Sequence, residues 1–152
     1  MHKAFTLVEI LIVVVVLGIL AAVAVPKFVS ASGEARITAT SEDLRAIENA
    51  VSMYFAKHGS YPRDVGRAQI NGVLAPYFKS ENPFLKEAPI GGVYDYEGPP
   101  NWSPVQISIR STRATNHSQD IATQLDEYMD DGNLKTGTIR RKGNRTYYIV
   151  GN

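Results

Sequence analysis

Oxygen-bearing side chains that could bind a metal ion gather around a glycine near the end of the chain. They are Asp126, Glu127, Asp130, Asp131 and Asn133, on either side of Gly132. Carboxylate and amide oxygens are the ligands that Ca²⁺ prefers, although the spacing is not that of an EF-hand loop. Solvated acids on a helix face account for the pattern without a metal, so we expect no cofactor. Calcium should stabilise the fold only if Asp126, Asp130 and Asp131 converge on one site.

The histidines do not form a catalytic or zinc site. They are His2, His58 and His117, and no two of them have the spacing of metal ligands on one helix or hairpin. Ser118 follows His117 directly, and we expect it to cap a helix and not to act as a nucleophile. The chain has no cysteine, which excludes disulfides, thiolate zinc sites and a cysteine nucleophile. Because no nucleophile, base and orienting group come together, we predict that the protein is not an enzyme.

The formal charge gives the chain little attraction to polyanions. The 16 Lys and Arg residues oppose 15 Asp and Glu residues, for a net charge of +1. Nucleic acid is therefore not an expected partner, and its binding would need a local patch. The basic run at Arg140, Arg141, Lys142 and Arg145 could meet DNA, another surface or a neighbouring acidic subunit. Charge on an edge hairpin also prevents stray strand pairing, and this role requires no ligand.

A glutamate lies inside the most apolar part of the sequence. The apolar run extends from Phe5 to Val25, and a helix of about 21 residues would be roughly 31 Å long, enough to cross a bilayer once. Since only His2, Lys3 and the α-amino group precede it, the short end should stay in the cytoplasm and the rest outside. A carboxylate inside such a span costs about 2.5–3.5 kcal/mol. We infer that Glu9 has a partner.

The apolar segment is also compatible with roles that give Glu9 no partner. A cleaved secretory signal would have a basic start, a shorter apolar core and a small-residue cleavage site, which Ala21–Ala24 could supply. The Glu9 side chain could extend to the membrane surface or carry a proton. Gly18 and Pro26 would weaken or kink any membrane helix, whatever its function.

Residues 4–10 resemble a known processing motif. They are Ala4, Phe5, Thr6, Leu7, Val8, Glu9 and Ile10. Between a short basic leader and a long apolar helix, they are similar to the motif of type IV pilins and type II secretion pseudopilins. The resemblance implies that a prepilin peptidase cuts between Ala4 and Phe5 and methylates the new amino group. The family usually has glycine where this chain has Ala4, which is small enough for cleavage.

The resemblance also implies how the chain is organised and assembled. Residues 1–4 would be a leader, 5–25 a membrane and filament-core helix, and 26–152 a soluble domain. Glu9 of one subunit would pair with the α-amino group of Phe5 in its neighbour. Gly18 and Pro26 would mark a break in the helix. A calcium site would also suit the resemblance, since some major pseudopilins bind calcium in their C-terminal region.

The implied function is that of a structural subunit of a type IV pilus-like filament. One alternative is a pseudopilin of a type II secretion system, and another, of a different class, is a single-pass anchored binding domain.

The implied partners are other copies of the chain, a prepilin peptidase, an inner-membrane platform protein, an assembly ATPase and, before assembly, membrane lipid. The precursor would lie in the inner membrane, and the filament would be periplasmic or extracellular.

The remaining sequence predicts an α+β fold. Helical spacing of apolar residues continues to His58, where Gly59 and Pro62 end the helix, so an apolar half should project and an amphipathic half should pack on a sheet. Residues 63–90 are expected to be connecting structure with a short helical turn. Strands are predicted at residues 93–96, 105–110, 138–141 and 145–150, and one extra short helix at residues 118–132. The expected domain is a small antiparallel sheet against one long helix, as in pilins.

Overall fold

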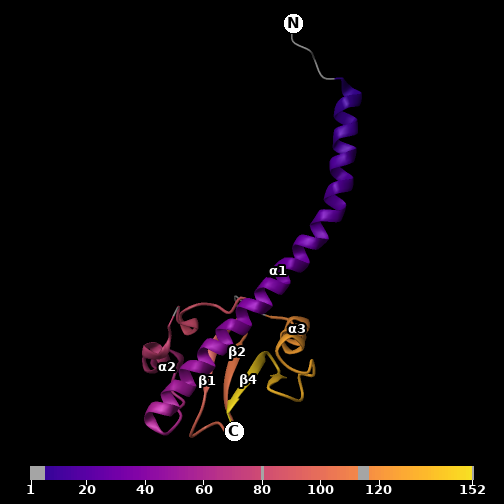
Figure 1. Ribbon diagram of the computed structural model, residues 1–152. Coiled ribbons are helices and arrows are strands. Elements are labelled where there is room, and N and C mark those ends of the chain that lie inside the picture. Colours follow the sequence, from indigo (N-terminus) through magenta and orange to yellow (C-terminus); the bar gives the residue numbers. More distant parts are fainter. Residues whose placement is uncertain (1–5, 80, 113–116, 152) are drawn as a thin grey trace. The chain divides into compact units, whose positions relative to one another are not determined.

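A computed structural model describes residues 6–79, 81–112 and 117–151, with only the backbone at residues 23–30, 68 and 151. The contacts divide the chain into two units, of which the first ends at Ala35 and the second begins at Arg36. Helix α1, Leu7–His58, supplies residues to both units. Every other helix and strand belongs to the second unit (Figure 1). The predicted apolar segment, which ends at Val25, falls wholly within the first.

Helix α1 ends where the sequence predicts. Lys57 and His58 form its last turn, where positive charge interacts favourably with the unpaired carbonyl groups. Gly59 has a φ of 69°, and its N–H donates to the Phe55 carbonyl at 2.8 Å. This left-handed conformation suits glycine and closes the helix.

The expected break at Gly18 and Pro26 does not interrupt α1. The backbone is helical at both positions. Proline removes one helical hydrogen bond, and the bonds of the neighbouring turns can keep the backbone helical around it. A softening of this segment on assembly stays a prediction.

The four predicted strands form one antiparallel sheet. They are β1 (Val93–Glu97), β2 (Val105–Arg110), β3 (Ile139–Lys142) and β4 (Arg145–Gly151), in the order β1-β2-β4-β3. Strands β3 and β4 form the predicted hairpin, in which Lys142 pairs with Arg145. Gly143 in the turn has a φ of 62°, which a hairpin of two connecting residues requires. The α+β fold is confirmed.

The structure has more short helices than the single extra one predicted. Helix α3, Gln119–Met129, is that one, and the Ser118 hydroxyl caps it by accepting from the Ile121 N–H at 3.2 Å. Helix α2, Arg67–Leu74, and the 3-10 turns η1, Ala75–Tyr77, and η2, Pro83–Leu85, lie in the stretch expected to be a connection. Among the α2 residues whose side chains the structure describes, only Ile70 and Leu74 are fully buried, too few apolar residues for a helical period to be recognised.

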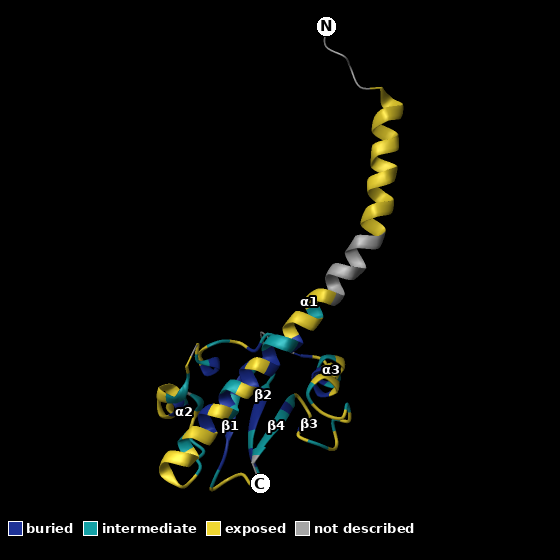
Figure 2. Ribbon diagram, viewed as in Figure 1, coloured by how far each residue is buried: buried dark blue, intermediate teal, exposed yellow. Residues whose placement is uncertain are grey.

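The core of the second unit lies between α1 and one face of the sheet (Figure 2). The buried positions of α1 recur every three or four residues, so they form one stripe along the helix; among the described side chains they are Ile37, Thr40, Ser41, Asp43, Leu44, Ile47, Ala50 and Val51. The sheet contributes alternate residues of its strands, which point to one face; they are Tyr94, Tyr96, Val105, Ile107, Ile109 and Ile139.

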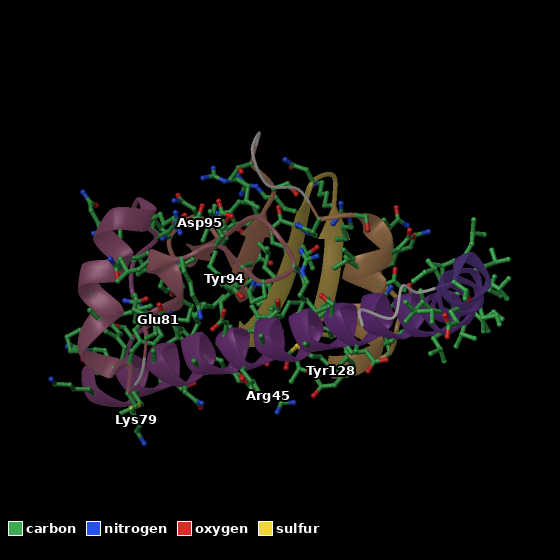
Figure 3. The ribbon with its side chains drawn as sticks, turned by 90° about the horizontal axis from the view of Figure 1, so that it is seen from above. Arg45, Lys79, Glu81, Tyr94, Asp95 and Tyr128 are labelled. Atoms are coloured by element: carbon green, nitrogen blue, oxygen red, sulfur yellow. The ribbon has the colours of Figure 1, made fainter. Side chains whose placement is uncertain are left out.

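Two tyrosines bond this sheet face to carboxylates on α1. The Tyr94 hydroxyl donates to Asp43 at 3.0 Å, and the Tyr148 hydroxyl donates to Glu48 at 2.8 Å. Lys86 lies 3.0 Å from the other Asp43 oxygen, so the buried carboxylate has both a hydrogen bond and a counter-charge. Figure 3 shows Tyr94 between the sheet and α1, with Arg45 on the opposite side of the helix. These bonds fix the register of α1 on the sheet.

Candidate functional site

The first candidate site is the start of α1, where Thr6 and Glu9 cap the helix. The Thr6 N–H and hydroxyl donate to Glu9 Oε2 at 2.8 and 2.9 Å, and the Glu9 N–H donates to Thr6 Oγ1 at 3.2 Å. This reciprocal pattern is a capping box, which satisfies N–H groups that would otherwise be unpaired. Glu9 Oε1 has no hydrogen-bond donor among the described residues, so the carboxylate can accept from a second partner.

The helix after this cap exposes apolar side chains on every side. Between Leu7 and Leu20, the large apolar residues are 48% to 83% exposed. A Cβ atom added to Gly18 would meet no other atom within 4 Å, so no packing in the described chain requires glycine there. A helix that is apolar all round is normally buried among other helices or in lipid. In the described part of the chain, no helix offers an apolar stretch long enough to cross a membrane.

Several predicted site residues lie outside the described residues. They are Ala4 and Phe5, together with the side chain of Pro26. The cleavage site, the pairing of Glu9 with the amino group of Phe5 and the membrane span at residues 5–25 therefore stay predictions.

The second candidate site is the acidic cluster at the end of α3, and its three acids do converge. One carboxylate oxygen from each of Asp126, Asp130 and Asp131 lies within 4.8 Å of the others. The Asp126 side chain is fully buried, and neither of its oxygens has a hydrogen-bond partner among the described residues. Burial, together with the negative charges of Asp131, Asp130 and Glu127, raises the pKa of Asp126 to about 6. A cation between the three carboxylates would supply the missing partner.

The turn after α3 holds the other two acids in place. Asp130 Oδ2 accepts from the Thr138 N–H, from the Thr138 hydroxyl at 2.9 Å and from the Ile139 N–H at 3.3 Å. Asp131 accepts from the Asn133 N–H at 2.8 Å and from the Thr136 hydroxyl at 2.7 Å. The backbone bond from Thr138 lowers the pKa of Asp130, so this carboxylate is ionised at neutral pH and can bind a cation.

Glycine is required where this turn passes Asp130. Gly137 has a φ of 68°, and a Cβ atom there would collide with the Asp130 carboxylate. The sequence pattern drew attention to Gly132 and did not indicate this second glycine. The signal that could have found it is the Thr-Gly-Thr segment between the helix and the hairpin, because turn residues gather there.

Known proteins resemble both the N-terminal segment and a larger part of the chain. Residues 1–25 match the family described as the prokaryotic N-terminal methylation motif. The type IV major pilin protein PilE1 of Neisseria gonorrhoeae is 31% identical over 59% of this chain, and the match spans about half, 53%, of that protein. The type II secretion system core protein G of Pseudomonas aeruginosa is 33% identical over 70% of this chain and 80% of its own length. The chain belongs to the type IV pilin and type II secretion pseudopilin family.

A solved pilin structure supports the fold of this pilin-family chain. The major type IV pilin PilA1 from Clostridium difficile superposes with a TM-score of 0.54 at 16% identity, covering 79% of this chain and 97% of that one. At this identity the likeness concerns the fold alone. The relatives of this pilin-family chain are structural subunits and not enzymes.

A buried histidine network in this pilin-family chain was not predicted from the sequence. His117 is fully buried between the Thr146 hydroxyl, 2.8 Å from Nε2, and the Ser111 hydroxyl, 3.2 Å from Nδ1. The Arg141 guanidinium donates to the His117 carbonyl at 3.3 Å. Burial, together with the positive charge of Arg141, lowers the pKa of His117 from its ordinary 6.5 to about 4. His117 therefore holds the chain before α3 in place as a neutral side chain.

Acid should weaken the fold through His117. The unfolded histidine takes up a proton below pH 6.5, whereas the folded one does so only near pH 4, so this contribution to stability is full above pH 6.5 and is lost as the pH falls. Between pH 7 and pH 5 the loss should be about 2 kcal/mol. Urea unfolding of the full chain in nonionic detergent, followed by Trp102 fluorescence, measures it. His117→Gln should lose about 2 kcal/mol less than wild type over this range, and equal losses would contradict the prediction.

Proposed function

We propose that this chain is a structural subunit of a type IV pilus-like filament whose core is a bundle of α1 helices. The observation that carries the proposal is the apolar surface on every side of α1 from Leu7 to Leu20, which has no partner in the described chain. Lipid would cover this surface before assembly, and neighbouring copies of the same helix would cover it afterwards. Exchanging lipid for helices gains packing and polar pairing more than hydrophobic burial.

Glu9 would supply the polar pairing. Its Oε2 atom already holds the Thr6 cap, while Oε1 is available to the positively charged α-amino group of Phe5 in a neighbouring subunit. A buried ammonium group needs such a counter-charge. The pairing would therefore favour one axial register between subunits, and it would keep the helix cap of each subunit intact.

The proposal predicts that the native protein begins at Phe5. A prepilin peptidase would remove residues 1–4 and methylate the new amino group, which intact mass and N-terminal sequencing of native material can establish. Ala4→Gly should be processed at least as fast as wild type, because glycine is the usual residue before the cut. Retention of Met1, or a cut after Ala24, would contradict the proposal and favour an anchored domain or a secretory signal.

A second candidate function is that of a pseudopilin in a type II secretion system. Two observations favour it. The match to core protein G of Pseudomonas aeruginosa covers 80% of that relative, whereas the match to the neisserial pilin covers 53%. The orphaned, buried Asp126 fits a Ca²⁺ site with Asp130 and Asp131, as the resemblance to calcium-binding pseudopilins implies. Extracellular fibres that contain this chain would favour the pilus, and confinement to the periplasm would favour the pseudopilus.

The partners and location follow from either candidate. Besides other copies of the chain, they would be the peptidase, a membrane platform protein and a cytoplasmic assembly ATPase. The precursor would lie in the inner membrane with its α+β domain outside the cytoplasm. Cross-linking of native membranes, before and after loss of the ATPase, would distinguish a precursor pool from an assembled filament.

A further inference from the structure

The face of the sheet that points away from α1 carries an electropositive hollow of about 660 Å³. Its wall comes from β2, β3, β4 and the two loops beside them, and its charged members are all basic: Lys135, Arg140, Arg141, Lys142 and Arg145. Among the described residues, no Asp or Glu lines the hollow. In a chain of net charge +1, this amounts to a strong local concentration of positive charge.

The strand register places like charges side by side at this end of the sheet. Arg110 of β2 pairs with Arg145 of β4, which in turn pairs with Lys142 of β3. Like charges directly opposite each other destabilise a sheet. Glu97 compensates Arg145, whose guanidinium lies 2.8 Å from the carboxylate. In the described part of the chain, Lys142 has no carboxylate within ion-pair distance.

Two further cations at the hollow have no acidic partner either. Within residues 6–79, 81–112 and 117–151, neither Lys135 nor Arg140 makes an ion pair. Arg140 donates instead to the Gly137 carbonyl at 3.0 Å. The side chains of Lys135, Arg140 and Lys142 are all exposed, so three cations can meet an anionic ligand without breaking a pair within the chain.

Aromatic and apolar side chains also line the hollow. Trp102, Leu134, Tyr147 and Ile149 line it together with the cations. Trp102 is 39% exposed although it is a large apolar side chain. Solvent-accessible aromatic rings beside basic side chains are the combination with which proteins bind single-stranded nucleic acids, because bases stack on the rings while phosphates meet the cations.

We propose that this surface binds a single-stranded nucleic acid. Each unit of such a strand carries one negative charge and one flat ring, and the hollow offers cations and aromatic rings together. A duplex hides the faces of its bases, and an acidic peptide does not carry a ring on each unit. The net charge of the whole chain did not indicate this binding, because acids elsewhere cancel the basic hollow.

The test uses the unassembled full chain in nonionic detergent and a fluorescein-labelled oligothymidylate, with binding followed by anisotropy. We assume that Lys135, Arg140 and Lys142 each contact one phosphate. A plot of the logarithm of the binding constant against the logarithm of the salt concentration should then have a slope of about −2. Binding should then weaken about 20-fold between 50 and 200 mM salt. Because unassembled protein is used, the result does not depend on filament formation.

Variants separate the charged from the stacking contacts. Arg140→Ala with Lys142→Ala should reduce the slope to less than half. Trp102→Ala should weaken binding about tenfold while the slope stays unchanged. The matched control is Arg45→Ala with Lys79→Ala, which removes the same charge from exposed residues that do not line the hollow and should bind as wild type does. Figure 3 labels both residues.

Four outcomes would overturn the proposal. One is a control variant that loses as much affinity as the double variant in the hollow. Another is a DNA duplex that binds as tightly as the oligonucleotide, together with a Trp102→Ala variant whose affinity is unchanged. This result would mean that charge alone attracts the ligand. Tighter binding of polyglutamate than of the oligonucleotide would indicate an acidic protein partner. A change of oligomeric state in the hollow variants would indicate a contact between copies of the chain.

Discussion

Glu9→Ala is expected to abolish or sharply slow filament assembly while membrane insertion stays intact or improves. Removing a carboxylate from an apolar span lowers the cost of insertion by about 2.5–3.5 kcal/mol. The α-amino group of Phe5 would nevertheless enter the filament core without its anion, and breaking a buried pair costs about 3–5 kcal/mol. Membrane fractionation measures the first effect, and the yield of sheared or cross-linked multimers measures the second.

Thr6→Ala is the matched control for this variant. It removes the hydroxyl that bonds to the Glu9 carboxylate and keeps the charge, so it should cost about 0.5–2 kcal/mol of helix stability. If the role of Glu9 is to pair with a neighbour, Thr6→Ala should still assemble. Equal failure of both variants would mean that the helix cap is what matters. Normal assembly of Glu9→Ala would remove the main physical support for the filament.

Asp126→Asn should change stability in opposite directions with and without calcium. The pKa of Asp126 is raised from 3.8 to about 6, so its ionised form costs the metal-free fold up to about 3 kcal/mol at neutral pH. The buried amide would still lack partners, and the net gain should be about 1–2 kcal/mol. With calcium at 100 times its dissociation constant, wild type should gain about 2.7 kcal/mol and the variant much less. Thermal unfolding in a chelator and in calcium measures both.

Asp120→Asn is the control for the calcium experiment. Asp120 is an exposed acid in the first turn of the same helix, so its replacement removes the same charge outside the cluster. Its response to calcium should equal that of wild type. A calcium effect that is equal in wild type and Asp126→Asn would show that the ion acts elsewhere. No effect of calcium on wild type would contradict the metal site and leave the acids as a solvated cluster.

Local patterns were enough to predict the long helix and the sheet. The period of Leu44, Ile47 and Val51 indicated the buried stripe of α1, and Gly59 indicated its end. Strict alternation at Val105, Ile107 and Ile109 indicated β2. These signals are local because each reports the side of one element that packs on the core.

Contacts between distant parts of the chain could not be predicted in the same way. No local pattern indicated that Asp126 is buried, because the burial depends on how α3 packs beside β3. Nor did any pattern indicate that the cations of the hollow lie together with Trp102, since this depends on strand register and on where the loops that carry Lys135 and Trp102 pass. The capping role of Thr6 could have been found from its spacing of three residues to Glu9, but the apolar run drew attention to the charge alone.

The two tyrosine bonds between the sheet and α1 have a mechanical consequence. Asp43 and Glu48 are about 7.5 Å apart along the helix axis at 1.5 Å per residue, and each accepts from a different strand. Sliding α1 by one turn, about 5.4 Å, would break both bonds together. In a filament under tension, a pulling force along α1 would therefore act on both hydrogen bonds at the same time, in the shear direction. The domain would resist such a pull at two points at once, and would not peel from the helix bond by bond.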